Sequence, residues 1–179
     1  MHVDKNKLPS AESERERYEK HQNSIHDFGY ISFLNIAIEA TLPFLESGMK
    51  GLDFGCGPNP VLSQLLEKRG LPCAWYDPFF FPDKPECTFD FIFATECVEH
   101  FHNPRAEFLY ISSLLNKEGI LTIMTSMWDE ESSLKDWYYL RDYTHVSIFH
   151  PKTIEFIADA FDFNTVYTDQ KKVVVLRKR

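Results

Sequence analysis

Segments whose apolar residues recur at the spacing of one helical face alternate along the chain with short runs of consecutive apolar residues. The first pattern predicts amphipathic helices, which begin at capping residues or prolines and end near glycines. We expect helices over residues 10–21, 31–45, 60–69, 104–115 and 151–161. The second pattern is typical of strands that are buried on both faces of a sheet. We expect strands over residues 49–54, 71–76, 89–94, 119–125, 165–167 and 173–176.

The order of these elements indicates an α/β fold. Strands and helices alternate through most of the chain, which favours a mostly parallel sheet with helices on both faces. The last two strands are expected to form an antiparallel hairpin. Residues 1–9 are expected to be disordered, and residues 78–88 and 127–150 are expected to be loops. No repeat or linker divides the 179 residues, so we expect a single domain over residues 1–179.

Charge and cysteine content argue against several classes of protein. The formal net charge is −8, and an acidic chain repels phosphate backbones, so a nucleic acid is not expected as a partner. The four cysteines form no Cys-x-x-Cys pair, which argues against a zinc knuckle and for free thiols. The N-terminus lacks an apolar leader, and no run reaches the roughly 18 apolar residues of a membrane span. We therefore expect a cytoplasmic protein that does not enter a membrane.

A glycine-containing bend after the first predicted strand carries the main functional signal. Gly55 and Gly57 lie one residue apart directly after that strand, which permits a tight turn and the close approach of a ligand to the backbone. Asp77 lies at the end of the second predicted strand, where its carboxylate would accept hydrogen bonds from the ribose hydroxyls of an adenosine. This spacing fits both NAD and S-adenosylmethionine.

Other residues of the bend distinguish between these two cofactors. Pro60 occupies the place of the third glycine in the dinucleotide fingerprint, and Pro58 and Pro60 lack the N–H groups that a pyrophosphate requires. Asp53, two residues before the first glycine, would attract the ammonium and sulfonium charges of S-adenosylmethionine and repel a pyrophosphate. The bend therefore favours S-adenosylmethionine.

At these residues the chain resembles the class I S-adenosylmethionine-dependent methyltransferases, particularly the small methyltransferase-domain group that includes ubiquinone-biosynthesis-like enzymes. The similar motifs are residues 53–57, Asp77, residues 89–101 and residues 114–121, and the resemblance extends from about residue 18 to the C-terminus. It implies a Rossmann-like fold and a methyl transfer that converts S-adenosylmethionine to S-adenosylhomocysteine. Only residues 78–88 separate the ribose acid from the next strand, so the family's third strand and its helix are expected to be shortened or absent.

The resemblance also implies a set of residues that bind the cofactor. They are Asp53, Gly55, Gly57, Asp77, Pro78, Phe79 and Glu96. Phe79 and Phe80 would either enclose the adenine or cover the edge of the sheet, and both interpretations stay open.

The N-terminal region is expected to cover the cofactor. In related enzymes N-terminal helices form a lid, so residues 1–47 are expected to be a helical lid over a core of residues 48–179. Tyr30 is a candidate substrate contact near the methionine end of the cofactor. Tyr18 and His21 are further candidates in the same region, and the alternative role for all three is helix packing.

The segment after the strand predicted over residues 119–125 lies at the carboxyl edge of the sheet, where ligands bind in open α/β folds. Its candidate substrate contacts are Trp137, Tyr139 and Arg141. Arg141 would hold a carboxylate or phosphate of the acceptor, or pair with Asp136 or Asp142. His145 would act as a catalytic base toward an attacking hydroxyl or amine, or would cap a turn.

Acidic and histidine residues after the third predicted strand raise the question of a metal site. Glu96 and His100 would share a face if the segment were helical, and Glu99 and His102 lie beside them. The resemblance offers a simpler account, in which Glu99 and His100 cap the turn after a strand. No metal is therefore expected.

The predicted function is methyl transfer from S-adenosylmethionine to a small-molecule acceptor that the sequence does not identify. Two alternatives are kept. One is a module that binds the cofactor without turnover, and the other is an NAD-dependent oxidoreductase on a related fold. The sequence does not indicate the oligomeric state.

Overall fold

The computed structural model describes residues 1–20, 23–128, 134 and 137–179, and its centre is a six-stranded sheet. The strands are β1 (Gly51–Phe54), β2 (Cys73–Tyr76), β3 (Phe89–Thr95), β4 (Leu115–Met124), β5 (Phe163–Thr168) and β6 (Val173–Lys178). They lie in the order β2-β1-β3-β4-β6-β5. The first four strands pair in parallel, whereas β6 runs antiparallel to β4 and β5. The expected mostly parallel sheet with a C-terminal antiparallel hairpin is confirmed.

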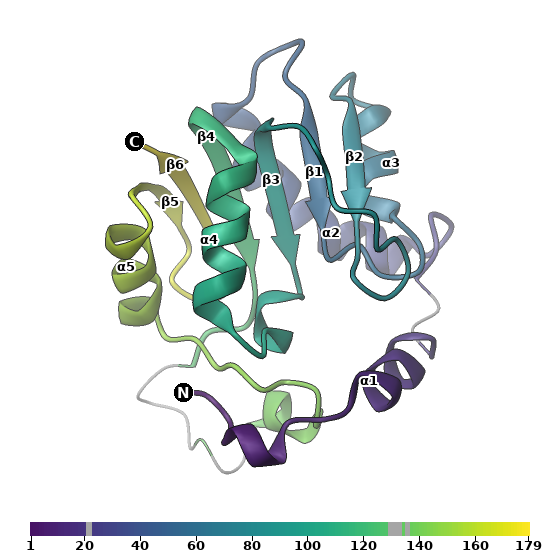
Figure 1. Cartoon of the computed structure of the whole chain (residues 1–179). Coiled ribbons are helices and arrows are strands. Elements are labelled where there is room, and N and C mark those ends of the chain that lie inside the picture. The colour runs from purple at the N-terminus through teal and green to yellow at the C-terminus, as the bar shows by residue number, and fades with distance from the viewer. Residues whose placement is uncertain (21–22, 129–133, 135–136) are drawn as a thin grey trace.

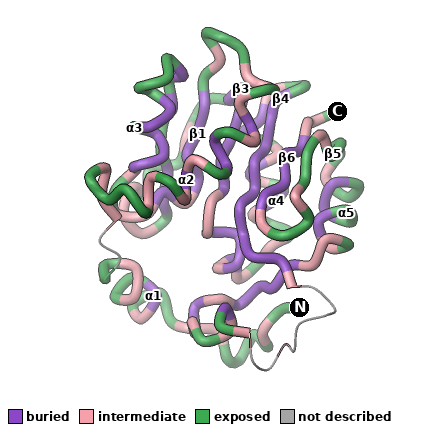
Figure 2. The backbone as a smooth tube through the Cα atoms, turned by 180° about the vertical axis from the view of Figure 1, so that it is seen from behind, coloured by how far each residue is buried: buried purple, intermediate pink, exposed green. Residues whose placement is uncertain are grey.

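Helices cover both faces of this sheet. They are α1 (Ala11–Tyr18), α2 (Phe28–Thr41), α3 (Val61–Glu67), α4 (Pro104–Leu114) and α5 (Pro151–Ala160). Figure 1 shows α4 and α5 in front of the sheet, and α2 and α3 behind it. The opposite view in Figure 2 brings α2 and α3 to the front. The result is the three-layered α/β architecture that the alternating pattern predicts.

Each face of the sheet buries its own hydrophobic cluster. On one face, Phe108 and Ile111 of α4 pack with strand residues such as Leu121. On the other face, Leu34 of α2 packs with Phe91 of β3. Because both faces are covered, the central strands are almost continuously apolar, which explains why their hydrophobic runs were readable in the sequence.

The helix starts follow the expected capping chemistry with one difference. Ser10 caps α1 and Asn103 caps α4, each through its side-chain oxygen, and Pro104 is the first residue of α4. Pro60, which we expect in the first turn of a helix, instead precedes α3 as its N-cap residue. Its ψ of 68° is not helical, so the helix begins at Val61.

The sheet ends at β2, which agrees with the expected loss of the family's third strand and helix. Residues 77–88 connect β2 to β3 as a loop, with one isolated bridge between Asp77 and Phe81. Trp75 of β2 is 45% exposed at this edge. The short connection leaves no length for a further strand-helix unit.

The expectation that residues 1–9 are disordered is wrong. The N-terminal ammonium of Met1 donates to the carbonyl of Ile148 at 2.7 Å, and the N–H of Val3 donates to the carbonyl of Val146 at 2.8 Å. The N-terminus therefore pairs with residues 146–148 through backbone groups. Because this pairing needs no apolar side-chain pattern, nothing in the N-terminal residues signals it.

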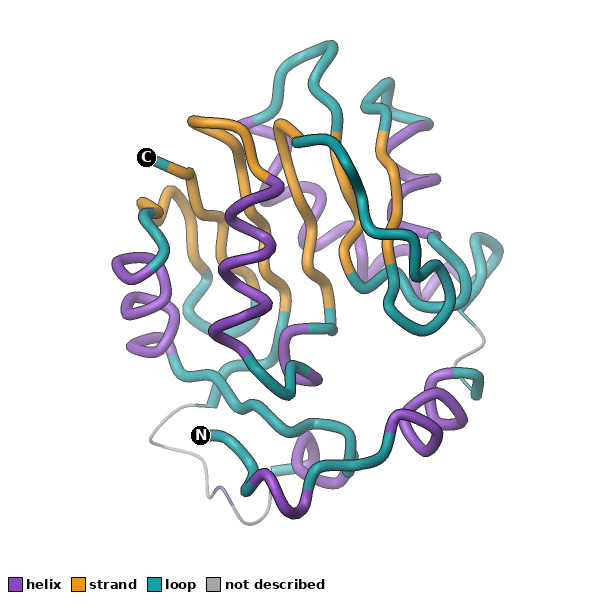
Figure 3. The backbone as a smooth tube through the Cα atoms, viewed as in Figure 1, coloured by secondary structure: helices purple, strands orange, loops and turns teal. Residues whose placement is uncertain are grey.

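The carboxyl ends of the parallel strands face the N-terminal segment. In Figure 3 the N-terminal residues, α1 and the loop before α5 lie beyond the ends of β1 and β3, and in Figure 1 the arrowheads of these strands point toward them. This is the edge at which ligands bind in open α/β sheets. Among the described residues, no helix combines the length and apolarity that a membrane span needs.

Candidate functional site

A cavity of about 690 Å³ lies at the carboxyl ends of β1, β2 and β3. Its wall includes the glycine bend after β1, the start of the loop after β2, residues 95–97 and 99–102, and His145. Residues of α1, α2 and α3 and Glu107 of α4 contribute to the remaining wall. A volume of this size is within the range of small-molecule and cofactor sites.

The two glycines of the bend have different structural roles. Gly55 and Gly57 have φ values of 76° and 68°, which side-chain-bearing residues rarely adopt. A Cβ atom on Gly55 would lie 2.6 Å from the Cβ of Cys97, so this glycine is required for packing. A Cβ atom on Gly57 would meet no atom within 4 Å, so the bend is open on that side. The backbone at Gly57 is thus accessible to a ligand in the cavity.

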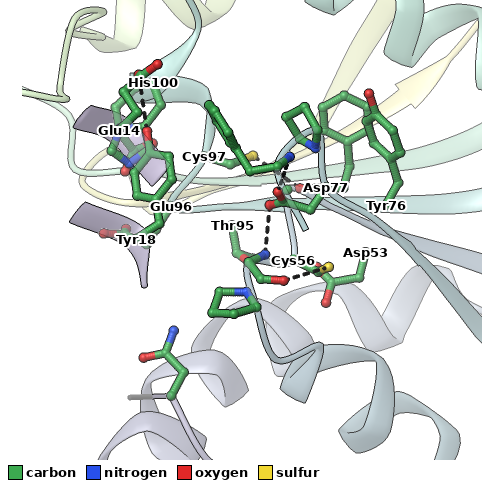
Figure 4. A pocket seen from close by; sticks show the side chains of 18 of the residues that line it. Glu14, Tyr18, Asp53, Cys56, Tyr76, Asp77, Thr95, Glu96, Cys97 and His100 are labelled. Atoms are coloured by element: carbon green, nitrogen blue, oxygen red, sulfur yellow. Dashed lines mark hydrogen bonds between the residues drawn. The ribbon is translucent and has the colours of Figure 1, made fainter. Parts of the chain in front are cut away.

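Asp77 is held in place by backbone groups. Its Oδ2 accepts a hydrogen bond from the N–H of Gly57 at 2.9 Å, and its Oδ1 accepts from the N–H groups of Phe79 and Phe80 at 2.8 and 3.2 Å. Figure 4 shows the carboxylate between the bend and the loop after β2. A carboxylate offers about four acceptor positions. The three backbone bonds orient Asp77 and leave acceptor capacity for a hydroxyl of a ligand.

Asp53 forms part of the cavity floor and is 2% exposed. Burial raises the pKa of this carboxyl to about 7, although the backbone and hydroxyl of Ser63 oppose the shift. The Ser63 hydroxyl donates to Oδ2 at 3.4 Å. A cation in the cavity would favour the ionised carboxylate, which is the interaction expected of an ammonium or sulfonium group.

Glu96 follows β3 and has a φ of 48°. Burial, and then the charge of Glu99, raise the pKa of Glu96 to about 8, while Lys172 opposes the shift. Its Oε1 is buried and has no hydrogen-bond partner among the described residues. Because a buried polar atom without a partner is costly, this oxygen fits a hydrogen-bond donor of a ligand.

The predicted aromatic and substrate residues are distributed unevenly. Pro78, Phe79 and Tyr30 line the cavity. Phe80 is not among the lining residues and instead lies 5.9 Å from the guanidinium of Arg15. Thus only Phe79 of the two phenylalanines is positioned beside a ligand in this cavity.

A second hollow of about 380 Å³ adjoins the first and shares Glu96 and His145 with it. Tyr139 and Arg141, two of the predicted acceptor contacts, line this second hollow. Trp137 lines neither hollow, and its ring lies 5.0 Å from that of Tyr139.

Asp142, an alternative partner considered for Arg141, is bound instead by Arg17. Their side chains lie 2.7 Å apart. The pairing fixes α1, which carries Arg17, to the wall of the second hollow. The other alternative partner, Asp136, lies outside the described residues.

His145 lies within a cluster of polar and aromatic side chains. Its Nδ1 is 2.7 Å from the carbonyl oxygen of Tyr139, and its ring lies 4.9 Å from that of His100. Burial, and then the proximity of His100, lower the pKa of His145 to about 4. The imidazole is therefore neutral at pH 7, and its conjugate acid is too strong for efficient proton abstraction. A role for His145 as a base stays a prediction.

Two contacts of α1 were not expected from the sequence, and a third involves the candidate residue Tyr18. Glu14, expected on a solvated helix, is 4% exposed and its Oε1 lies 3.0 Å from Nε2 of His102. The hydroxyl of Tyr143 donates to the carbonyl of Ser13 at 2.9 Å. The ring of Tyr18 lies 5.5 Å from that of Phe79. The charge pattern of α1 gave no signal for the contacts of Glu14 and Ser13, whereas Tyr18 was a candidate and lines the cavity. His21 lies outside the described residues.

The fold and the cavity together define a Rossmann-like α/β domain with a small-molecule-sized cavity at the carboxyl edge of its sheet. Residues 30–168 match a family model described as a methyltransferase domain, so the chain belongs to this family of class I S-adenosylmethionine-dependent methyltransferases. The family uses S-adenosylmethionine, which agrees with the choice over NAD that the proline-containing bend favours. No curated protein matches the sequence.

Solved structures share the fold at low sequence identity. A methyltransferase from Archaeoglobus fulgidus is 16% identical with a TM-score of 0.61, and the match covers 90% of this chain and 98% of that one. Phosphoethanolamine N-methyltransferase 2 from Haemonchus contortus, bound to phosphomonomethylethanolamine and S-adenosylhomocysteine, is 16% identical with a TM-score of 0.52. That match covers 74% of this chain but only 38% of the nematode enzyme. The cyclase SpnF is 14% identical with a TM-score of 0.56, covering 88% of this chain and 84% of that one.

Proposed function

We propose that this protein transfers a methyl group from S-adenosylmethionine to a small-molecule acceptor. The observation that carries the proposal is the arrangement of Asp77 and Gly57. The carboxylate is oriented by backbone N–H groups, and the glycine beside it leaves one side of the bend open to the cavity. This arrangement suits the ribose of an adenosine, and it occurs in a chain of the methyltransferase-domain family.

The remaining residues of the cavity fit the rest of the cofactor. Phe79 would contact the adenine, and Tyr30 would lie toward the methionine end, where α2 forms the wall. The unpartnered Oε1 of Glu96 would accept a hydrogen bond from the ammonium group. Asp53 would provide a negative potential beneath the cationic part of the molecule.

The protein contributes mainly alignment and exclusion of water. When bound, S-adenosylmethionine supplies a methyl group that is already activated by its sulfonium leaving group. The residues of both hollows would hold an acceptor atom in line with that methyl group, and α1 would cover the cavity as a lid. The neutral imidazole of His145 would accept a proton from the acceptor only weakly, which favours an acceptor that is already a free nucleophile.

We propose an acceptor that carries an anionic group. Arg141 and Arg17 both line the second hollow, and Arg17 is already paired with Asp142. Arg141 therefore provides a guanidinium for a carboxylate or phosphate. The nematode enzyme with the same fold binds phosphomonomethylethanolamine, an acceptor of this kind.

A thermal-shift panel with S-adenosylmethionine, S-adenosylhomocysteine, NAD and NADP tests cofactor binding. At a hundred times its dissociation constant, a ligand should add about 2.7 kcal/mol to the stability. We expect shifts with the first two compounds only. Asp77→Asn should abolish them, whereas the matched control Asp83→Asn, on the exposed part of the same loop, should retain them. A shift with NAD alone would refute the assignment.

Methyl transfer itself needs a separate measurement, because a fold does not fix a reaction. The similarity to a protein named as a cyclase illustrates this point and keeps a cofactor-binding module without turnover as the second candidate. The chain is incubated with methyl-labelled S-adenosylmethionine and a pool of small metabolites. Transfer of the label that disappears in Asp77→Asn supports the enzyme, whereas cofactor binding without transfer to any fraction supports the module.

A further inference from the structure

We propose that Glu99, His100 and His145 form a binding site for one divalent transition-metal ion in the wall of the cavity. Each residue offers a ligand atom, and these three atoms all lie within 4.8 Å of one another. All three residues line the cavity. The site brings together a turn after β3 and a segment some 45 positions later in the chain, so sequence spacing does not reveal it.

The hydrogen bonds of both imidazoles indicate that Nε2 is the nitrogen that would bind a metal ion. Nδ1 of His145 lies 2.7 Å from the carbonyl oxygen of Tyr139, and Nδ1 of His100 lies 2.9 Å from the carbonyl oxygen of Thr144. A carbonyl oxygen only accepts hydrogen bonds, so each Nδ1 carries the proton and each Nε2 carries a lone pair. Histidine ligands of metal ions are commonly held in this way, with the other ring nitrogen donating to a backbone carbonyl.

Glu99 provides the independent sign of a ligand. Its side chain is fully buried, and its Oε1 accepts a hydrogen bond from the hydroxyl of Tyr139. Its Oε2 is also buried but has no hydrogen-bond partner among the described residues. Leaving a carboxylate oxygen unpaired in the interior is costly, and a cation at this position would satisfy it.

The backbone holds the three residues together without a metal. The carbonyl of Glu99 accepts hydrogen bonds from the N–H groups of Val146 and Ser147 at 2.9 and 2.8 Å. These bonds join the turn Val98–His100 to the residues that directly follow His145. Such a rigid scaffold lowers the cost of assembling a coordination site.

The ligand set selects the kind of ion. Two imidazoles and one carboxylate suit zinc, cobalt, nickel or iron in the divalent state, whereas magnesium and calcium prefer oxygen ligands. Three protein ligands also leave a position for water or another molecule, as in catalytic zinc sites. Because His145 lines both hollows, we expect that position to be accessible to an oxygen or nitrogen atom of the acceptor, a consequence that rests on the proposed function.

Metal titration of the chelator-treated full chain tests the site without cofactor or acceptor. We expect one equivalent of Zn²⁺ or Co²⁺ to bind in calorimetry, and Co²⁺ to develop visible absorption bands. Loss of an outer-shell partner weakens metal binding by about 10- to 100-fold. Removing a ligand in His145→Ala or Glu99→Gln should weaken it by at least about 100-fold.

His102→Gln is the matched control, because His102 lies two residues from His100 and contacts Glu14 instead of the cluster. This variant should bind the metal like the wild type. Far-UV circular dichroism and the metal-free thermal shift with S-adenosylhomocysteine verify that each variant folds. The thermal shift with S-adenosylhomocysteine also distinguishes a failure of the metal site from a failure of the proposed function, because it reports cofactor binding without metal.

Several results would overturn the metal site. The first is the absence of stoichiometric binding, and the second is unchanged metal affinity in both His145→Ala and folded Glu99→Gln. The third is a loss of metal affinity in His102→Gln equal to that in the ligand variants, and the fourth is Mg²⁺ binding as tight as Zn²⁺ binding. If Glu99→Gln does not fold, His100→Gln replaces it, and retained Co²⁺ spectra in that variant and in His145→Ala overturn the proposal.

Discussion

Replacing Asp53 by asparagine should stabilise the protein without ligand and weaken its binding of the cationic cofactor. The variant keeps the shape of the side chain and an oxygen that accepts from Ser63, but it removes the ionisable group. Burial raises the pKa of the Asp53 carboxyl from its ordinary value of 3.8 to about 7. A shift of this size corresponds to about 4 kcal/mol between the protonated and ionised forms.

The sign of the pH dependence follows from proton linkage. The folded carboxyl of Asp53 holds its proton up to about pH 7, whereas the unfolded carboxyl loses it near pH 4. The stability that this group contributes is therefore present at low pH and is lost as the pH rises through about 7. Asp53→Asn lacks this loss. The difference in unfolding free energy between the variant and the wild type should therefore grow by about 3 kcal/mol between about pH 5 and about pH 8.

Urea unfolding of both proteins across this pH range measures the difference directly. If the unfolding free energies of the two proteins change by the same amount with pH, the account of Asp53 as a buried proton-binding group is wrong. Calorimetry at about pH 8 provides the second readout. The variant should lose at least about tenfold more affinity for S-adenosylmethionine than for S-adenosylhomocysteine, because only the former carries the sulfonium charge. Asp83→Asn is the surface control.

Four further substitutions test the packing of the fold and the attachment of α1. Gly55→Ala should lower the unfolding free energy by at least about 2 kcal/mol, because the added Cβ meets Cys97. Gly57→Ala should lower it by only about 1 kcal/mol, because its Cβ meets no atom. Comparable losses of the two variants in urea unfolding would contradict the different packing of the two glycines. Phe108→Ala should cost about 3–5 kcal/mol in the same assay, since the ring is 1% exposed in the core. Arg17→Ala should lower the unfolding free energy by less than about 1 kcal/mol but accelerate hydrogen exchange over residues 11–18. Unchanged exchange would show that the ion pair does not hold α1 in place.

The architecture was predictable because local patterns and the global fold agree. The buried runs of β3 and β4 and the capped start of α4 at Asn103 were evident from residue type alone. Boundaries were less accurate where backbone pairing extends an element beyond its apolar run. Strand β4 begins at Leu115, four residues before its expected start, because Leu115 still aligns with Phe89. The pairing of the N-terminus with residues 146–148 was missed for the same reason.

In the candidate site, too, a local sequence pattern reveals some residues and not others. The bend at Gly55 and Gly57 and the acid at Asp77 follow from the sequence, because strand ends of a parallel sheet meet at one edge. The proximity of Glu99 to His145 depends on how a long loop returns across that edge, and no local pattern encodes it. His145 lines the cavity at the edge where the sequence predicts it, and the sequence suggested for it only a role as a base or a turn cap.

Burial of acidic groups around the cavity connects stability to function. Asp53 and Glu99 are buried there and Glu96 is half-buried, and the described residues offer only partial compensation through neighbours such as Ser63 and Lys172. Burying carboxylates without full pairing destabilises a fold. A cationic ligand would offset this cost, because a sulfonium group or a metal ion would supply positive charge that Lys172 provides only in part. Substitutions that neutralise these acids should therefore raise the stability of the ligand-free protein and lower that of the ligand-bound protein. This trade-off is expected where residues have been selected for binding and not for folding.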